Sequence, residues 1–149
     1  MRDDIDIDRL IPHRPPMRLV EGVATIDDSS IECVSTVRAS WPTAHDGRVS
    51  TSMLIELIAQ TAAVLQGWKE RHGKNVGKGG LLVGIQGATF AAPSIPVGTQ
   101  LVCAVRISHG VQSYLAFDGE VQDDKGAVWL TGSIQAFRPD NPAEPGETP

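Results

Sequence analysis

Short stretches in which apolar and polar residues alternate follow one another along most of the chain. Such alternation is typical of strands that bury one face and expose the other. Turn-forming residues separate these stretches, among them the Asp-Asp-Ser-Ser run at 27–30 and the His-Gly pair at 109–110. Because strands joined by tight turns run antiparallel, we expect one antiparallel sheet. Its strands are predicted at 17–26, 31–37, 81–90, 100–108, 113–121 and 127–137.

One long helix is predicted at 53–71, after the possible capping residues Ser50, Thr51 and Ser52. The first half of this helix is apolar on nearly every face, which indicates burial within the fold. A short helix is expected at 5–10, ending before the proline pair at 15–16. A curved sheet is the only element large enough to cover the long helix. The pattern therefore predicts an α+β hot-dog fold, with a curved antiparallel sheet wrapped around one long central helix.

Length and composition narrow the class of protein further. The 149 residues suffice for one domain, expected at 1–138, followed by a Pro-rich, acidic and disordered tail at 139–149. The net charge of -5 argues against nucleic acid as the partner, because phosphate binding needs a basic surface. The acidic start argues against a signal peptide, and the absence of a long apolar run argues against a membrane helix. We expect a cytoplasmic protein.

The cysteines and histidines give little support to a metal or a disulfide. Cys33 and Cys103 lie in apolar, strand-like segments and are expected to remain reduced. The four histidines are scattered without a paired Cys/His spacing, so no metal site is expected. The sequence indicates no cofactor.

Glu56 is the most informative residue, because it lies in the apolar half of the long helix, where an unpaired carboxylate is costly. Gln60 follows one helical turn later on the same face. The small residues Ala63 and Gly67 continue this stripe and are expected to leave room beside the carboxylate. One interpretation is a catalytic acid or base whose proton affinity is raised by burial and which Gln60 positions. The alternative is an acid that only complements the helix dipole. Gln60 and the small residues favour the catalytic interpretation.

Proton transfer at neutral pH calls for a second titratable group, and histidine suits this pH best. His45 lies in the loop ahead of the long helix and can fold back over its N-terminus. His13 is held by the rigid Arg-Pro-Pro run that follows it. The sequence leaves open whether His13, His45 or neither is catalytic. His72 and His109 are set aside, since an exposed helix end and a turn are expected there.

Three segments carry a resemblance to a known family. Residues 10–23 (LIPHRPPMRLVEGV) resemble the opening of the FabA/FabZ-type 3-hydroxyacyl-acyl-carrier-protein dehydratases. Residues 56–60 (ELIAQ) are similar to the family's helix motif, whose acidic residue is catalytic. Residues 84–98 (GIQGATFAAPSIPVG) resemble the family's third-strand signature and the turn that follows it. The resemblance spans residues 8–138 in the same order. It implies a hot-dog fold, a catalytic role for Glu56, and dimers whose two active sites lie at the interface.

The chain departs from this family just ahead of the long helix. Where the family has a catalytic histidine in a His-Phe-Pro segment, this chain has Pro42, and Ser50-Thr51 replaces the family's Pro-Gly pair. The segment at 46–48 (DGR) is similar to the divergent dehydratases of the aryl-polyene type, which keep the early Pro-His and the helix Glu. The role of Glu56 therefore carries over, whereas the histidine's role does not carry over by position.

The implied reaction is loss of water from a 3-hydroxyacyl thioester to give a trans-2-enoyl thioester. A histidine would remove the C2 proton, Glu56 would protonate the departing hydroxyl, and backbone donors at the helix N-terminus would polarise the thioester carbonyl. Candidate substrate-binding residues are Gln60, Ser52 and Gly87. Two rival functions are acyl-thioester hydrolysis, with Glu56 activating water, and a non-catalytic hot-dog partner subunit. The lost His-Phe-Pro segment keeps the second rival open.

The expected partners follow from this chemistry. The substrate is carried by acyl carrier protein or by coenzyme A, and a second hot-dog chain completes a homodimer, a higher oligomer of dimers or a heterodimer. Positive charge is concentrated at the end of the long helix and after it, at Lys69, Arg71, His72, Lys74 and Lys78. Arg14 and Arg18 can add to it. This charge fits either docking of an acidic carrier protein or a solvated helix end, which basic residues also suit.

Overall fold

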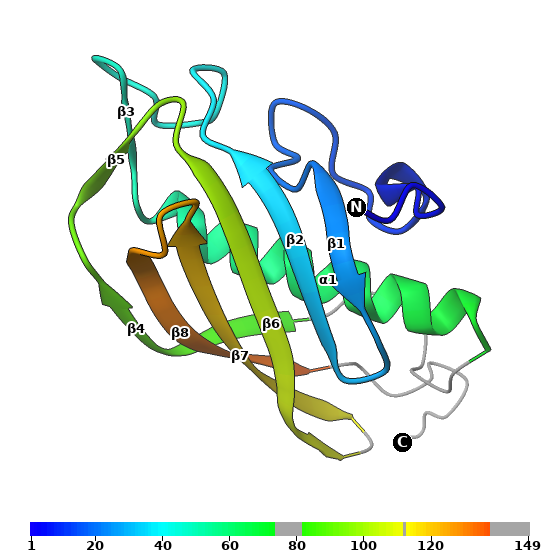
Figure 1. Ribbon diagram of the computed structural model, residues 1–149. Coiled ribbons are helices and arrows are strands. Elements are labelled where there is room, and N and C mark those ends of the chain that lie inside the picture. Colours follow the sequence, from blue (N-terminus) through cyan, green and yellow to red (C-terminus); the bar gives the residue numbers. More distant parts are fainter. Residues whose placement is uncertain (74–81, 112, 138–149) are drawn as a thin grey trace.

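The computed structural model describes residues 1–73, 82–111 and 113–137, and its largest element is a six-stranded antiparallel sheet. The strand order in the sheet is β1-β2-β6-β7-β8-β4. The strands are β1 (Gly22–Ile26), β2 (Ser30–Thr36), β4 (Leu82–Phe90), β6 (Gln100–Val111), β7 (Tyr114–Asp123) and β8 (Val128–Phe137). Figure 1 shows the strands curving across one side of the helix α1 (Met53–Arg71). The α+β architecture predicted from the sequence is confirmed.

The helix α1 has the predicted bounds and is the centre of the hydrophobic core. Leu54, Leu57 and Leu65 are fully buried. A methyl group added at Gly119 of β7 would come within 2.7 Å of the Ile58 side chain, so the helix lies directly against the sheet at this point. The pattern of apolar residues predicted both the helix and its burial correctly.

The N-terminal segment differs from the prediction. The short helix is a 3-10 helix, η1 (Ile7–Arg9), in which the Asp6 carboxylate accepts a hydrogen bond from the Asp8 amide. Residues 17–21, predicted as the start of the first strand, lie outside β1. Leu19 and Val20 are fully buried there. Side chains bind much of this backbone, as where the Leu19 carbonyl accepts from the Ser35 hydroxyl, and β2 is bonded directly at Glu21, whose amide donates to the Val34 carbonyl. The alternation of apolar and polar residues at 17–21 therefore predicted burial correctly, but the predicted strand pairing was wrong.

A two-stranded ribbon was not predicted from the sequence. It consists of β3 (Arg48–Ser50) and β5 (Ser94–Pro96), paired antiparallel, and Val49 and Ile95 face the core. Strands of this length have no readable periodicity, and the prolines around β5 are typical of a turn. The ribbon ends directly before α1, so it sets the direction in which the helix begins.

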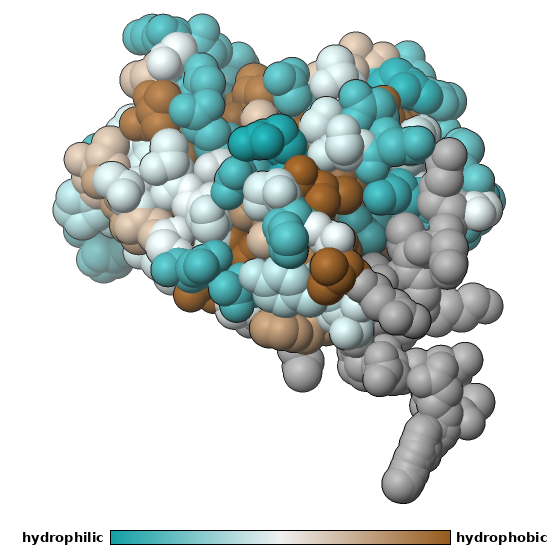
Figure 2. All heavy atoms as spheres, turned by 90° about the horizontal axis from the view of Figure 1, so that it is seen from below, coloured by the Kyte–Doolittle hydropathy of each residue, from teal (hydrophilic) through white to brown (hydrophobic). Residues whose placement is uncertain are grey.

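Two predicted segments fall largely or wholly outside the described residues, namely the connector at 73–80 and the tail at 139–149. Within the described ranges, no helix is long and apolar enough to cross a membrane. The face seen in Figure 2 carries apolar side chains in separate patches among polar ones.

Candidate active site

The structure brings His13 and Glu56 together. His13 Nε2 lies 3.6 Å from Glu56 Oε2, with the two side chains 32% and 37% exposed. Glu56 projects from the first turn of α1, whereas His13 belongs to the loop that follows η1. A base and an acid that are close and still open to solvent can each reach the same small substrate.

Gln60 connects this pair to the rest of the fold. Its side-chain amide nitrogen donates to Glu56 Oε2 at 2.9 Å and to the Met17 carbonyl at 2.7 Å, and its oxygen accepts from the Leu19 amide at 2.8 Å. Gln60 is 1% exposed, so a bond lost here would leave a buried polar group unpaired. One side chain therefore fixes the carboxylate of Glu56 and the segment that leads away from His13.

The surroundings of Glu56 differ from the expectation in two respects. The carboxylate is partly exposed rather than enclosed in apolar side chains, because it lies on the helix face turned toward the His13 loop. The stripe of small residues does not leave room as far as Gly67. A Cβ at Gly67 would lie 2.7 Å from the Leu10 carbonyl oxygen, so the N-terminal segment fills this space.

The His13 ring is held differently at its two nitrogens. Nε2 faces Glu56, whereas Nδ1 is buried and has no hydrogen-bond partner among the described residues. A ring with a hydrogen bond at Nδ1 would have its orientation fixed by that bond. The position of the His13 ring therefore depends on its contact with Glu56 and on the backbone that carries it.

His45, the other candidate, is not brought to Glu56. It lies in a tight turn in which its amide and that of Arg48 donate to each other's carbonyls. Its ring lies 3.1 Å from the Asp46 carboxylate, and the side chain is 85% exposed. Of the two histidines, only His13 contacts Glu56 within the described part of the chain.

The predicted substrate-binding residues other than Gln60 occupy different places. Ser52 occupies the N-cap position of α1 one turn before Glu56 but makes no side-chain capping bond, and its hydroxyl bonds instead to that of Ser50 at 2.8 Å. Two of the first amides of the helix are already used, by the carbonyls of Thr51 and Ser52, which leaves less of this terminus for a thioester carbonyl. Gly87 lies at a bulge in β4.

Gly87 borders a groove of about 710 Å³ on the sheet, built by different residues from those around Glu56. Its polar side chains come from the sheet face turned away from α1, and they include Glu32, Arg106, Asp118, Glu120, Thr131 and Ser133. The structure does not bring Gly87 together with His13 and Glu56.

Two arginines lie near His13 and bind the chain around it. From the sequence, these arginines were expected only to add positive charge to a surface that docks a carrier protein. Arg14 and Arg18 both pair with the Asp8 carboxylate. The described members of the basic segment are Lys69, Arg71 and His72, while Lys74 and Lys78 lie outside the described residues. Across the described ranges, no group of three or more His, Cys, Asp or Glu side chains is arranged to hold a metal ion.

Comparison with known proteins shows the family to which the chain belongs. Residues 5–146 match the model of the ApeP-like family, described as ApeP dehydratase. The 3-hydroxyacyl-[acyl-carrier-protein] dehydratase FabZ of Streptococcus uberis is 34% identical over 68% of this chain and 74% of its own length. FabZ of Nitrosomonas eutropha is 31% identical over 74% and 83%.

Solved structures show the same fold. A chain of the dehydratase heterocomplex ApeI:P from Xenorhabdus doucetiae superposes with a TM-score of 0.75 at 24% identity, covering 93% of both chains. The PaaI protein of E. coli superposes with a TM-score of 0.59 at 13% identity, covering 78% of this chain and 82% of its own. From the family match and the FabZ relatives together, the chain belongs to the ApeP-like dehydratases, hot-dog proteins related to FabZ.

Proposed function

We propose that this protein removes water from a 3-hydroxyacyl thioester and releases a trans-2-enoyl thioester, using His13 and Glu56 of the same chain. The observation that carries the proposal is the 3.6 Å approach of His13 Nε2 to Glu56 Oε2 beside the bracing amide of Gln60. The FabZ relatives support it, since they are 3-hydroxyacyl-carrier-protein dehydratases that share the reaction class.

The elimination needs one base and one acid on the reacting carbons. Neutral His13 takes the proton from C2, the C3–O bond breaks, and the carboxylic acid form of Glu56 gives its proton to the departing hydroxyl, which leaves as water. His13 then carries the proton taken from C2, and Glu56 is left as a carboxylate. Return of this proton across the short gap between the two side chains restores both groups, so atoms and charge balance without a cofactor.

Gln60 supports the acid in this scheme. Its amide donates to Glu56 Oε2 and holds that oxygen on the side of His13. Since the same amide group is bonded to the backbone at Met17, the carboxylate cannot rotate without breaking a buried network. Gln60 therefore acts on the substrate through Glu56.

The free edge of the sheet supports a dimer. Within the described residues, β4 pairs with β8 on one side and with no strand on the other. Ile85 and Phe90 on this strand are 55% and 39% exposed, and β4 carries no charged residue. A long uncharged edge strand is prone to aggregate unless another strand covers it. We assign this edge to a second copy of the chain.

The carrier and the compartment complete the proposal. We take acyl carrier protein as the carrier, because the FabZ relatives are named for it and because Arg71 and His72 expose positive charge at the end of α1. Free thiols at Cys33 and Cys103 suit the reducing cytoplasm, where we place the protein.

The test uses a short 3-hydroxyacyl thioester, with the enoyl product followed by ultraviolet absorbance and mass spectrometry. His13→Asn should abolish product formation, whereas His45→Asn should turn over like wild type. Release of free thiol from a saturated acyl thioester, without enoyl product, would identify a hydrolase instead. Full activity of the His13→Asn variant would remove His13 from the mechanism.

A further inference from the structure

The loop that carries His13 has few backbone hydrogen bonds of the kind that stiffen helices and sheets. It runs from η1 to the segment bound by Gln60, and residues 11–14 belong to no helix, strand or turn. Nδ1 of His13 has no hydrogen-bond partner among the described residues, and the contact of Nε2 with Glu56 does not hold the backbone of the loop. Something else must hold this loop in the shape that presents His13 to Glu56.

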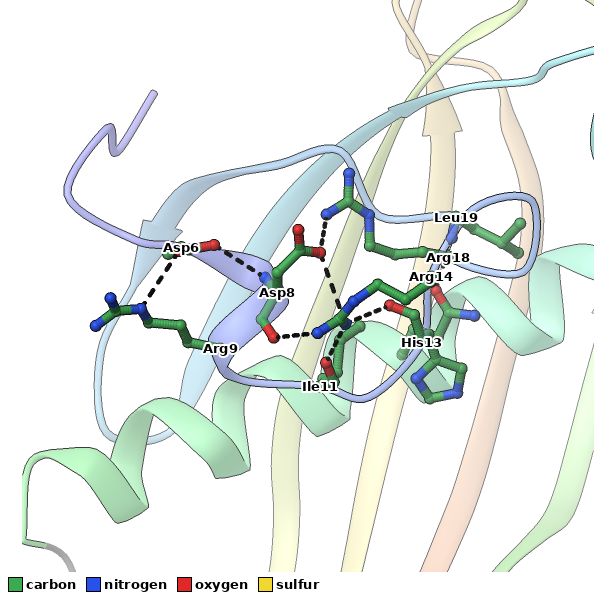
Figure 3. Close-up of polar contacts among 9 residues, drawn as sticks. Asp6, Asp8, Arg9, Ile11, His13, Arg14, Arg18 and Leu19 are labelled. Carbon is green, nitrogen blue, oxygen red and sulfur yellow. Dashed lines mark hydrogen bonds and ion pairs between the residues drawn. The ribbon is translucent and has the colours of Figure 1, made fainter.

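The guanidinium of Arg14 binds the loop from within. Its Nη1 donates to the carbonyls of Ile11 at 3.0 Å and His13 at 2.8 Å, and its Nη2 donates to the carbonyl of Asp8 at 3.0 Å. Figure 3 shows the side chain folded back toward Asp8, with the His13 ring on the other side, next to α1. One planar cation thus binds three carbonyls within residues 8–13.

The charge of Arg14 is itself held in place. Its Nη1 lies 3.7 Å from Asp8 Oδ1, the oxygen that also pairs with Arg18. Hydrogen bonds from a guanidinium to carbonyl oxygens are charge-assisted and directional, and they need the rigid fork that lysine lacks. The Asp8 carboxylate keeps the cation beside the backbone, and the cation keeps the backbone folded.

We propose that Arg14 is a positioning residue for His13: it fixes the backbone on the N-terminal side of the histidine, as Gln60 fixes the segment on the C-terminal side. The inference rests on the proposed role of His13. It differs from a docking role, in which Arg14 would bind the acidic carrier and its loss would weaken carrier binding.

The chain offers a closely matched control. Arg38 forms a two-pronged contact with Glu21, with distances of 2.8 and 3.1 Å, and its side chain is 54% exposed, as is that of Arg14. Arg38 binds a carboxylate and no loop carbonyl of the His13 segment. Arg38→Lys therefore controls for the loss of a guanidinium on the surface.

The experiment compares Arg14→Lys, Arg14→Ala and Arg38→Lys on a small 3-hydroxyacyl thioester that lacks a carrier protein. Displacing a catalytic group by about 1 Å can cost 10²-fold in rate, so we expect kcat of both Arg14 variants to fall by about 10- to 100-fold with KM little changed. Millimolar guanidinium ion should restore part of the activity of Arg14→Ala. Arg38→Lys should match wild type.

Wild-type kcat in Arg14→Lys would overturn the proposal. So would an effect confined to KM for the carrier-protein substrate, because that is the signature of docking. A nuclear magnetic resonance readout separates this proposal from the proposed function. If the wild type turns over no thioester, a shift of the His13 imidazole signals in Arg14→Lys but not in Arg38→Lys still supports positioning, and unchanged signals contradict it.

Discussion

Gln60 illustrates what the sequence tells about a single residue and what it does not. Its spacing from Glu56 placed both on one helix face, and the structure has them bonded at 2.9 Å. The same side chain also binds the backbone at Met17 and Leu19, which are far away in the sequence. Helical periodicity predicts the contact between Gln60 and Glu56, but it does not predict the contacts of Gln60 with Met17 and Leu19. The choice between His13 and His45 depended on how the N-terminal segment packs on the helix, so it could not be made from the sequence.

The two cysteines are also explained at this scale. Cys33 of β2 and Cys103 of β6 face each other across neighbouring strands, and both are fully buried. Burial raises the pKa of each thiol to about 12, from an ordinary value of 9.0. Both groups therefore stay protonated in the folded protein at neutral and mildly alkaline pH.

We predict that a thiol-specific reagent at pH 8 labels neither cysteine in the native protein and both after unfolding in denaturant. The reason is that the thiolate is the reactive species and burial suppresses it. The raised pKa of the two thiols also makes the stability of the fold depend on pH. The unfolded thiols ionise first, so stability should fall as the pH rises from about 9 toward about 12. Rapid labelling of either cysteine in the folded protein would contradict this assignment.

Among the elements, α1 was predicted with its bounds, because its apolar positions and the polar residues at its end are local signals. The strands of the large sheet were also predicted, with shifts at their ends. The segment at 17–21 and the β3–β5 ribbon were missed for a different reason. Alternation at 17–21 reflects burial, and it does not reveal that side chains such as Gln60 bind this backbone. The ribbon pairs two strands of three residues, which are too short to show a period.

The contact between α1 and the N-terminal segment gives a prediction at the scale of elements. In a helix interior, replacing glycine by alanine normally stabilises the protein by about 0.5–1 kcal/mol. At Gly67 the added Cβ would lie 2.7 Å from the Leu10 carbonyl oxygen, and such overpacking costs about 1–3 kcal/mol. Gly67→Ala should therefore lower the free energy of unfolding in a urea titration, and it should reduce turnover by shifting the loop of His13.

A matched control for this substitution lies in β4. At Gly84 an added Cβ would have no atom within 4 Å, and the surroundings are open. Gly84→Ala should leave the free energy of unfolding of the single chain close to wild type. If Gly67→Ala were as stable as Gly84→Ala and as active as the wild type, the packing of the N-terminal segment on α1 would not matter for the site.

At the scale of the whole molecule, the uncharged edge at β4 is the feature that a single chain does not explain. Ile85→Lys places a charge on this edge and should convert a dimer into a monomer in sedimentation or light-scattering measurements. Val111→Lys is the control, since Val111 is similarly exposed, at 59% against 55%, but lies on β6. A dimer that survives Ile85→Lys would use another surface. A wild-type monomer that binds a different hot-dog chain would point to a heterodimer.

The whole molecule also explains why family membership alone does not identify the active site. The resemblance to the FabA/FabZ type implies a histidine ahead of the long helix, and this chain has Pro42 there. The fold compensates by bringing the N-terminal loop, with His13, against the first turn of α1. The sequence left His13 and His45 as alternatives, and the folded chain is what supports His13 and Glu56 as the proposed catalytic pair.

The most direct test of the dehydratase mechanism is the rate of enoyl formation from a short 3-hydroxyacyl thioester by Glu56→Gln, with Glu70→Gln as the control. Glutamine has the shape of glutamate but no proton to give, and general acid catalysis contributes about 10²–10⁴-fold in rate. Since Glu70 lies exposed at the far end of α1, its variant should match wild type. We predict that Glu56→Gln loses at least about 100-fold in turnover while remaining folded. A folded Glu56→Gln protein with the wild-type rate would contradict the mechanism.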